Sequence, residues 1–319
     1  MTRFDILQCI DSLLQKKLVM VTGKGGIGKS FVTSILAQRA VEMGLRVCIV
    51  ESSSQDQQAP IFGRPAVGHK MTPLYPRLSV INLNAQDNFR DFVVLHLGFA
   101  KLFERVFTKP LVRSFIQMLP GIGELTLLGR IYHICELTDE FDLVIFDGFA
   151  TGHFLSLLKT PEAVLRSGMV GPVIEETNKV RDFLEDQSKV GVLLVSTPEE
   201  LVVSESLQFT DRFLNELNMS LDGVVVNKCL SVIQTEAPSD SLISDSGQTG
   251  IALDYLAKRI ANEKTNIHSL KEGLKSRFDG QPGHLPFLMV SPDFGAIEEP
   301  LPDGFHRQTF DDALSLSVE

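Results

Sequence analysis

One stretch of eight residues constrains the fold of this chain more than any other. Residues 23–30 read GKGGIGKS and match the pattern G-x-x-x-x-G-K-[ST] in full. The apolar segment LVMVT precedes them, and the helical pattern SFVTSILAQRA follows. In this setting the backbone N–H groups of a glycine-rich loop turn inward, and the helix N-terminus attracts anions. The sequence therefore predicts a nucleotide phosphate site between a buried strand and a helix.

The residues of this loop have different expected roles. Lys29 is expected to neutralise the β- and γ-phosphates, and the hydroxyl of Ser30 to bind Mg²⁺. The other residues expected to contact ATP are Gly25, Gly26, Ile27, Gly28 and Phe31. A dinucleotide site with Glu51 on a ribose hydroxyl is a competing interpretation, but it does not account for Lys29 and Ser30. A chance glycine-rich turn is the other alternative.

The rest of the chain alternates between strand-like and helix-like patterns. Seven short apolar runs have the length and two-sided apolarity of buried parallel strands. They are Leu18–Val21, Val47–Val50, Leu78–Leu83, Leu143–Phe146, Gly191–Val195, Gly223–Val226 and Pro286–Val290. Helical patterns cover Ser30–Met43, Pro172–Asp186 and Pro198–Leu217, the last with Thr197 as its expected N-cap. This order predicts an α/β fold, a doubly wound and mainly parallel sheet of the P-loop NTPase class.

Residues 85–140 interrupt this alternation. They contain no obvious strand and hold many of the 21 phenylalanines of a chain that has no tryptophan. We expect one domain over residues 1–319, with a helical insertion at about 85–140. Within it, Leu95–Phe107 has apolar residues at helical spacing, which suits either a client helix or, more simply, the sheet core or a dimer interface. Residues 231–250 are rich in Ser, Asp and Gly and are expected to form a loop.

Charge and composition exclude several classes of function. The net charge of −10 disfavours binding to nucleic acid, which needs a basic surface. No apolar run reaches the roughly 18 residues of a membrane span, and residues 1–17 lack the features of a secretory signal, so we expect a cytoplasmic protein. The four cysteines are far apart in the sequence and form no zinc-binding spacing, so each is expected to be a core residue or a free thiol.

A second anchor for a nucleotide follows the strand at 141–146. Asp147 ends this strand, and the sequence continues GFATGH. A carboxylate at the carboxyl end of a parallel strand faces the ligand crevice. Asp147 is therefore expected to hold the water shell of Mg²⁺, with an exposed strand-end aspartate as the alternative.

The motifs KGGIGKS and DGFATGH together resemble those of the ArsA/Get-type ATPases, which include arsenite-pump ATPases and targeting factors for tail-anchored proteins. Residues 171–177, 195–200 and 225–228 extend the resemblance to about residues 16–230, in the bacterial single-domain branch. The resemblance implies a dimeric ATPase that couples its nucleotide state to a protein client or partner. It also implies that Lys24, of the deviant Walker A pattern, reaches the nucleotide of a partner subunit; a solvated surface lysine is the alternative. By the same resemblance Asn227 recognises adenine, and the segment around Pro286 closes over the base. The alternative for Asn227 is a residue that forms the turn at the end of its strand.

The sequence departs from the family at the segment after the second strand, residues 51–62, which we call switch I. The family pattern has an aspartate that positions the attacking water, and the alignment places Pro60 there. Asp56 is the nearest carboxylate; a shifted loop would make it catalytic, and otherwise it is simply solvated. We therefore expect ATP binding with slow hydrolysis, or a hydrolysis-deficient sensor subunit in a heterodimer. A positioning ATPase of the ParA/MinD kind is disfavoured by the acidic charge and by a tail without a basic amphipathic helix.

Two further family features are missing from the sequence. The CxxC of the tail-anchored-protein targeting factors is absent, so we expect no zinc-clamped dimer. The thiol cluster of an arsenite site is not evident, although Cys135 lies near the helical insertion.

Overall fold

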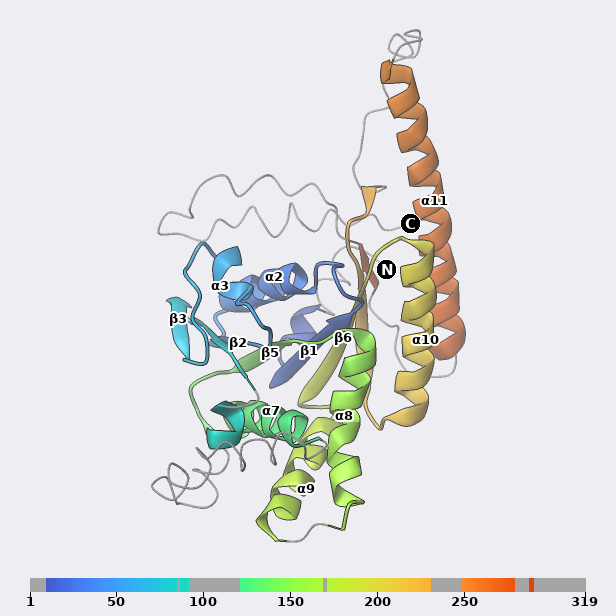
Figure 1. Ribbon diagram of the computed structural model, residues 1–319. Coiled ribbons are helices and arrows are strands. Elements are labelled where there is room, and N and C mark those ends of the chain that lie inside the picture. The colour runs from blue at the N-terminus through green and yellow to red at the C-terminus, as the bar shows by residue number, and fades with distance from the viewer. Residues whose placement is uncertain are drawn as a thin grey trace.

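The computed structural model describes residues 10–84, 87–91, 121–168, 171–230, 248–278 and 287–289. These residues contain an eight-stranded sheet with the strand order β3-β4-β2-β5-β1-β6-β7-β8 (Figure 1). The strands are β1 Leu18–Gly23, β2 Val47–Glu51, β3 Thr72–Tyr75, β4 Leu78–Asn82, β5 Leu143–Asp147, β6 Val190–Ser196, β7 Leu221–Val226 and β8 Phe287–Met289. The neighbouring pairs are parallel except for β3 with β4.

The predicted α/β class with a mainly parallel sheet is confirmed, and each of the seven predicted strands is present. The antiparallel strand β3 was missed by the sequence analysis. It has four residues, including Pro73, and it lies at the edge of the sheet. Proline lacks a backbone N–H, so within a sheet it is tolerated at an edge strand. A four-residue segment that contains proline looks like a turn in the sequence, which is why this strand was not predicted.

Helices cover both faces of the sheet, because successive side chains of a strand point to opposite sides. In β1, Leu18 and Met20 join one buried cluster, and Val19 and Val21 join the other. Figure 1 shows α2 and α3 on one side of the sheet and α7, α8 and α9 on the other, with α10 and α11 side by side. The helices are α2 Lys29–Glu42, α3 Gln58–Ile61, α7 Ile122–Tyr132, α8 Thr151–Leu165, α9 Pro172–Glu185, α10 Glu200–Glu216 and α11 Gln248–Phe278.

Two predicted boundaries are wrong. The helix expected from Pro198 with Thr197 as N-cap begins at Glu200, and its N-cap is Glu199. Glu199 has an extended backbone (φ −101°, ψ 132°), so the helix begins beyond the Thr-Pro step, and the buried hydroxyl of Thr197 has no hydrogen-bond partner among the described residues. Residues 248–250, expected in a loop, are the first turn of α11.

The expected helical insertion is described only in part. Residues 87–91 are helical, and α7 is followed by a π-helical segment, His133–Leu137. The amphipathic segment Leu95–Phe107 lies outside the described residues, so its role and the single-domain assignment stay predictions.

The cysteines of the described residues lie in the core. Cys48, Cys135 and Cys229 are buried and form no disulfide among the described residues, as expected of core residues. Among the described residues, no helix combines the length and the apolar character needed to cross a bilayer.

Candidate nucleotide site

The carboxyl ends of the central strands form the edge that carries the candidate site. The strand registers place Glu51 of β2 beside Asp147 of β5, and Gly23 of β1 beside Val195 of β6. β1 lies between β5 and β6 in the sheet. The strands β2 to β5 lie on one side of β1 and the strands β6 to β8 lie on the other, so the carboxyl end of β1 is the point where the strand order reverses. In open α/β sheets this crevice is where ligands bind.

The phosphate loop connects β1 to α2 and has the backbone that its glycines predict. Gly26 and Gly28 have positive φ angles of 80° and 94°, a region that side-chain-bearing residues rarely adopt. A Cβ atom on Gly28 would also lie 2.3 Å from the side-chain nitrogen of Asn227. Glycine is therefore required at position 28 both by the backbone angle and by the close approach of β7.

Lys29 extends back over this loop. Its Nζ donates a hydrogen bond to the carbonyl oxygen of Lys24 at 3.2 Å. Burial lowers the pKa of Lys29, and the nearby carboxylate of Asp147 opposes that shift. The loop thus contains a partly desolvated ammonium group beside inward-turning backbone, which is suited to a triphosphate.

Ser30 and Asp147, the two expected Mg²⁺ ligands, are brought together by side chains of switch I. The Ser30 hydroxyl donates to Oε1 of Gln57 at 2.8 Å. The Nε2 of Gln58 donates to Oδ2 of Asp147 at 2.8 Å and to the carbonyl oxygen of Ser30 at 3.0 Å. Burial raises the pKa of Asp147, whereas Ser30, Gln58 and the charge of Lys29 oppose the rise. A hydroxyl and a carboxylate in this arrangement are the donor set that Mg²⁺ prefers in nucleotide sites.

Glu51 is a buried carboxyl group at the start of switch I. Its Oε2 accepts hydrogen bonds from the backbone N–H groups of Gln57 at 2.9 Å and Gln58 at 3.4 Å. Burial raises the pKa of Glu51 to about 7, despite these hydrogen bonds, and the charges of Asp56 and Asp147 add to the rise. The sequence analysis gave Glu51 a role only in the dinucleotide alternative. In the structure it fixes the start of α3.

Asp56, the expected substitute for the missing water-positioning aspartate, is held by residues that lie outside switch I. Its carboxylate accepts hydrogen bonds from the backbone N–H groups of Val67 and of Gly68 (2.7 Å), and from the side chain of Asn82 at 2.5 Å. Burial opposes its ionisation, but these hydrogen bonds leave the pKa of Asp56 below its usual value. Pro60 is exposed. The structure therefore places Asp56 in a loop-stabilising network rather than with Ser30 and Asp147.

Asn227, expected to recognise adenine, lies at the end of β7 and contacts the phosphate loop directly. Its Nδ2 donates to the carbonyl oxygen of Ile27 at 2.8 Å. The next residue, Lys228, has a positive φ of 61° and donates from Nζ to the carbonyl oxygen of Gly26 at 3.0 Å. Lys228 belongs to the segment 225–228 that carries the family resemblance, but no role was predicted for it from the sequence. Pro286 lies outside the described residues, so its predicted contact with the base stays a prediction.

The segment after β5 contacts the end of β1, directly before the phosphate loop. A Cβ atom on Gly148 would lie 2.4 Å from the carbonyl oxygen of Val21, and the Thr22 hydroxyl donates to the carbonyl oxygen of Phe149 at 3.0 Å. The ring of His153 stacks on Phe149 with 4.0 Å between centroids. The DGFATGH motif is therefore packed against β1, next to the candidate nucleotide site.

Glu205 of α10 links the two motifs. Its Oε2 forms an ion pair with Nζ of Lys24 at 3.1 Å, and its Oε1 accepts a hydrogen bond from the Thr151 hydroxyl at 3.0 Å. Both partners of this ion pair are partly exposed. Lys24 therefore binds a glutamate of its own chain in this conformation, and the predicted contact with a partner's nucleotide requires this ion pair to open.

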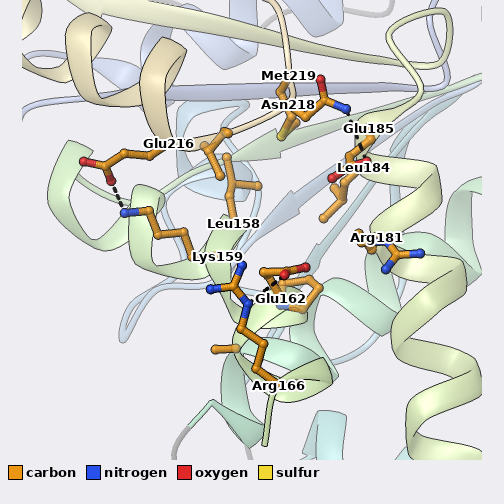
Figure 2. Close-up of a pocket in the computed structure, with 13 residues that line it drawn as sticks. Leu158, Lys159, Glu162, Arg166, Arg181, Leu184, Glu185, Glu216, Asn218 and Met219 are labelled. Atoms are coloured by element: carbon orange, nitrogen blue, oxygen red, sulfur yellow. Dashed lines mark hydrogen bonds and ion pairs between the residues drawn. The ribbon is translucent and has the colours of Figure 1, made fainter.

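A separate cavity of about 550 Å³ lies at the other end of α8 (Figure 2). Its lining includes apolar side chains such as Leu158, Leu184 and Met219. Its rim carries paired charges, with Lys159 bonded to Glu216 and with an Arg166–Glu162 ion pair at 2.9 Å. In these contacts the charges of the rim pair with one another.

Comparison with known proteins decides the family. The model of the ArsA family, described as anion-transporting ATPase, matches residues 16–171 and 169–244, more than half of the chain. The chain belongs to the ArsA family of ATPases. The resemblance expected from KGGIGKS and DGFATGH is thereby confirmed, and an ATPase of this family is expected to bind nucleotide.

The relatives within the ArsA family are distant. A putative arsenical pump-driving ATPase of Prosthecochloris vibrioformis is 25% identical over 252 residues, covering 67% of this chain and 61% of the relative. ATPase BagA of Mycobacterium tuberculosis is 24% identical over 225 residues, covering 66% and 65%. An ATPase ASNA1 homolog of Cryptosporidium parvum is 25% identical over 281 residues, covering 76% and 74%. The chain thus spans somewhat less than two thirds of the length of the first two of these relatives.

Proposed function

We propose that this protein binds ATP with Mg²⁺ at the phosphate loop, hydrolyses it slowly, and uses its nucleotide state to control a protein partner. The observation that carries the proposal is the assembly of Lys29, Ser30 and Asp147 at one edge of the sheet. Gln58 joins Ser30 to Asp147, and Lys29 lies over the loop with a lowered pKa.

In this proposal each group has one task. The backbone of residues 25–31 and the ammonium of Lys29 bind the phosphates. Ser30 and Asp147 hold Mg²⁺, which neutralises charge that develops on the phosphates. Asn227 recognises the base at the end of β7, and Pro286 closes over it. The family membership supports the use of ATP, because relatives are described as ATPases.

Slow turnover follows from switch I. Pro60 can neither accept a proton nor orient a water molecule. The carboxylate of Asp56 is occupied by Val67, Gly68 and Asn82. Loss of a water-positioning group lowers kcat while leaving the phosphate contacts intact.

The switch itself involves Lys24 and a second subunit, which is either a copy of this chain or a related ATPase. In the described conformation Lys24 pairs with Glu205, which also binds Thr151 of the DGFATGH motif. We propose that release of this ion pair accompanies dimerisation on ATP. Ordering of switch segments by the γ-phosphate and Mg²⁺ is a known way to change a protein surface. The client surface would be the helical insertion at about 85–140.

A second candidate function is a nucleotide sensor that does not hydrolyse ATP and acts in a heterodimer with a complete ATPase. The engagement of Asp56 away from Ser30 and Asp147 favours it. A hydrolysis assay with and without a candidate partner separates the two functions. Turnover by the purified chain alone favours the first, and turnover that appears only with the partner favours the second.

Two measurements test the proposal. Calorimetry with ATP, with and without Mg²⁺, should show binding that Mg²⁺ strengthens. A pull-down with Asp147→Asn in the presence of ATP should retain a partner that the same variant does not retain with ADP. Absence of ATP binding would refute the proposal, and equal recovery in the two nucleotides would refute the switch.

A further inference from the structure

We propose that Gln58 is a positioning residue of the Mg²⁺ site, holding Ser30 and Asp147 in place and offering Oε1 to a water of the metal's hydration shell. This inference rests on the proposed ATP-binding function and goes beyond it, since no motif of the family assigns a role to this glutamine. The side chain of Gln58 is 0% exposed, so its contacts are internal to the site.

The local fold directs Gln58 toward Asp147. Glu51, at the end of β2, is the neighbour of Asp147 in the sheet and accepts the backbone N–H of Gln58. The next residue, Ala59, and Phe62 are buried in the hydrophobic cluster under α2. The start of α3 is thus anchored by a hydrogen bond at one end and by apolar packing at the other.

The amide nitrogen of Gln58 supplies the first half of the role. Its two N–H groups are directed to Oδ2 of Asp147 and to the carbonyl oxygen of Ser30. A carboxylate that accepts a fixed hydrogen bond on one oxygen has its other oxygen oriented as well. Groups that orient metal ligands in this way have a large effect on metal affinity.

The amide oxygen of Gln58 supplies the second half. Oε1 is buried and has no hydrogen-bond partner among the described residues. A buried acceptor without a partner is uncommon in proteins and calls for a donor. A water bound to Mg²⁺ next to Ser30 and Asp147 is such a donor, and an amide oxygen accepts its hydrogen bond without removing its proton.

The test compares Gln58→Leu with wild type in a Mg²⁺ titration. The readout is the affinity for a fluorescent ATP analogue, first in EDTA and then at increasing Mg²⁺. We expect the affinity in EDTA to stay within about twofold, because the phosphate loop is unchanged. The Mg²⁺ concentration that produces half of the increase in analogue affinity should rise by roughly tenfold to a hundredfold. This is the usual consequence of losing a residue that orients metal ligands.

The matched control is Gln55→Leu, an exposed glutamine three residues earlier in the same segment. It should leave the Mg²⁺ dependence unchanged. If Gln58→Leu fails to fold, Gln58→Met, which is unbranched and of similar length, provides the same comparison. A Mg²⁺ requirement within twofold of wild type in the folded variant overturns the inference alone. If the wild-type protein binds no ATP with or without Mg²⁺, the proposed function fails and the inference falls with it.

Discussion

The phosphate loop and switch I lie at the same sheet edge, but they differ in how closely their residues match a known sequence motif. In the loop, residues 23–30 match a general motif in full, and the positive φ angles of Gly26 and Gly28 are those that the glycines permit. In switch I, residues 51–62 depart from the family pattern, and Gln58 takes up the contact with Asp147. We therefore expect ATP binding to be retained where the backbone itself forms the site, and hydrolysis to be slowed where it depends on single side chains.

The largest expected effect is on the loop. Lys29→Ala should weaken ATP binding by about a thousandfold, near 4 kcal/mol, because charge-assisted contacts to two phosphates are lost. The control is Lys24→Ala, which removes a lysine from the same loop whose ion pair is with Glu205. Calorimetry with Mg·ATP measures both, and equal losses in the two variants would contradict the separate roles of the lysines.

Gly28→Ala tests whether the positive φ angle and the close contact with Asn227 require glycine at this position. The new methyl group would meet the side chain of Asn227 at a left-handed backbone position, which should cost about 3 kcal/mol of unfolding free energy. Gly44→Ala is the matched control, because Gly44 has a φ of 88° with open space around its Cβ position, and should cost about 1 kcal/mol. Urea unfolding gives both values. Similar losses would show that contact with Asn227 adds nothing.

Glu51→Gln tests the electrostatics of switch I in the nucleotide-free protein. The folded-state pKa of Glu51 is raised from 4.5 to about 7, so the folded protein binds more protons than the unfolded chain between these values. Stability from this group is therefore present below pH 4.5 and lost as the pH rises toward 7. In the wild-type protein the full loss of unfolding free energy from this group is about 3 kcal/mol. The variant avoids this loss, but its new amide nitrogen has no acceptor, so its net gain in unfolding free energy over wild type at high pH is about 2 kcal/mol.

Urea unfolding of Glu51→Gln and wild type at pH 5 and pH 8 checks this prediction. The variant should gain stability relative to wild type as the pH rises. A difference that is the same at both pH values would show that Glu51 is not a buried group with a raised pKa.

Pro60→Asp is expected to have the smallest effect. Restoring a carboxylate at the family position should raise kcat by about tenfold, below the usual range for a well-placed general base, because Gln58 of switch I already binds Asp147. Pro65→Asp places the same change at another exposed proline of this loop region and should leave kcat unaltered. Steady-state phosphate release measures both variants. No rise in Pro60→Asp would remove the missing aspartate as the cause of slow turnover.

The contrast between loop and switch also explains how far the sequence predicted the structure. The strand-loop-helix motif at residues 18–43 and the strand ending in Asp147 were predicted, because local periodicity and a glycine-rich loop determine them. The contacts of Gln58 and Asp56 were not, because they depend on how a short segment packs against β5 and against residues 67–68. The N-cap of α10 was misplaced by two residues since Thr-Pro-Glu-Glu fits a helix start at more than one position.

Asn227 illustrates the same limit at a residue that was singled out. The sequence places it at the end of a strand, and the resemblance assigns it to adenine. Only the assembled sheet brings its amide to the Ile27 carbonyl and against Gly28, 200 residues away in the chain. Contacts between distant segments of this kind have no local signal in a single sequence.

The central claim, an intact phosphate loop combined with weakened hydrolysis, is tested by measuring Mg·ATP affinity and single-turnover hydrolysis on the same wild-type preparation. We predict binding of roughly micromolar affinity and a hydrolysis rate of about 10⁻² s⁻¹ or less, the range of GTPases that act without an activating partner. Tight binding with turnover near the enzyme median of about 10 s⁻¹, or no ATP binding at all, would contradict it.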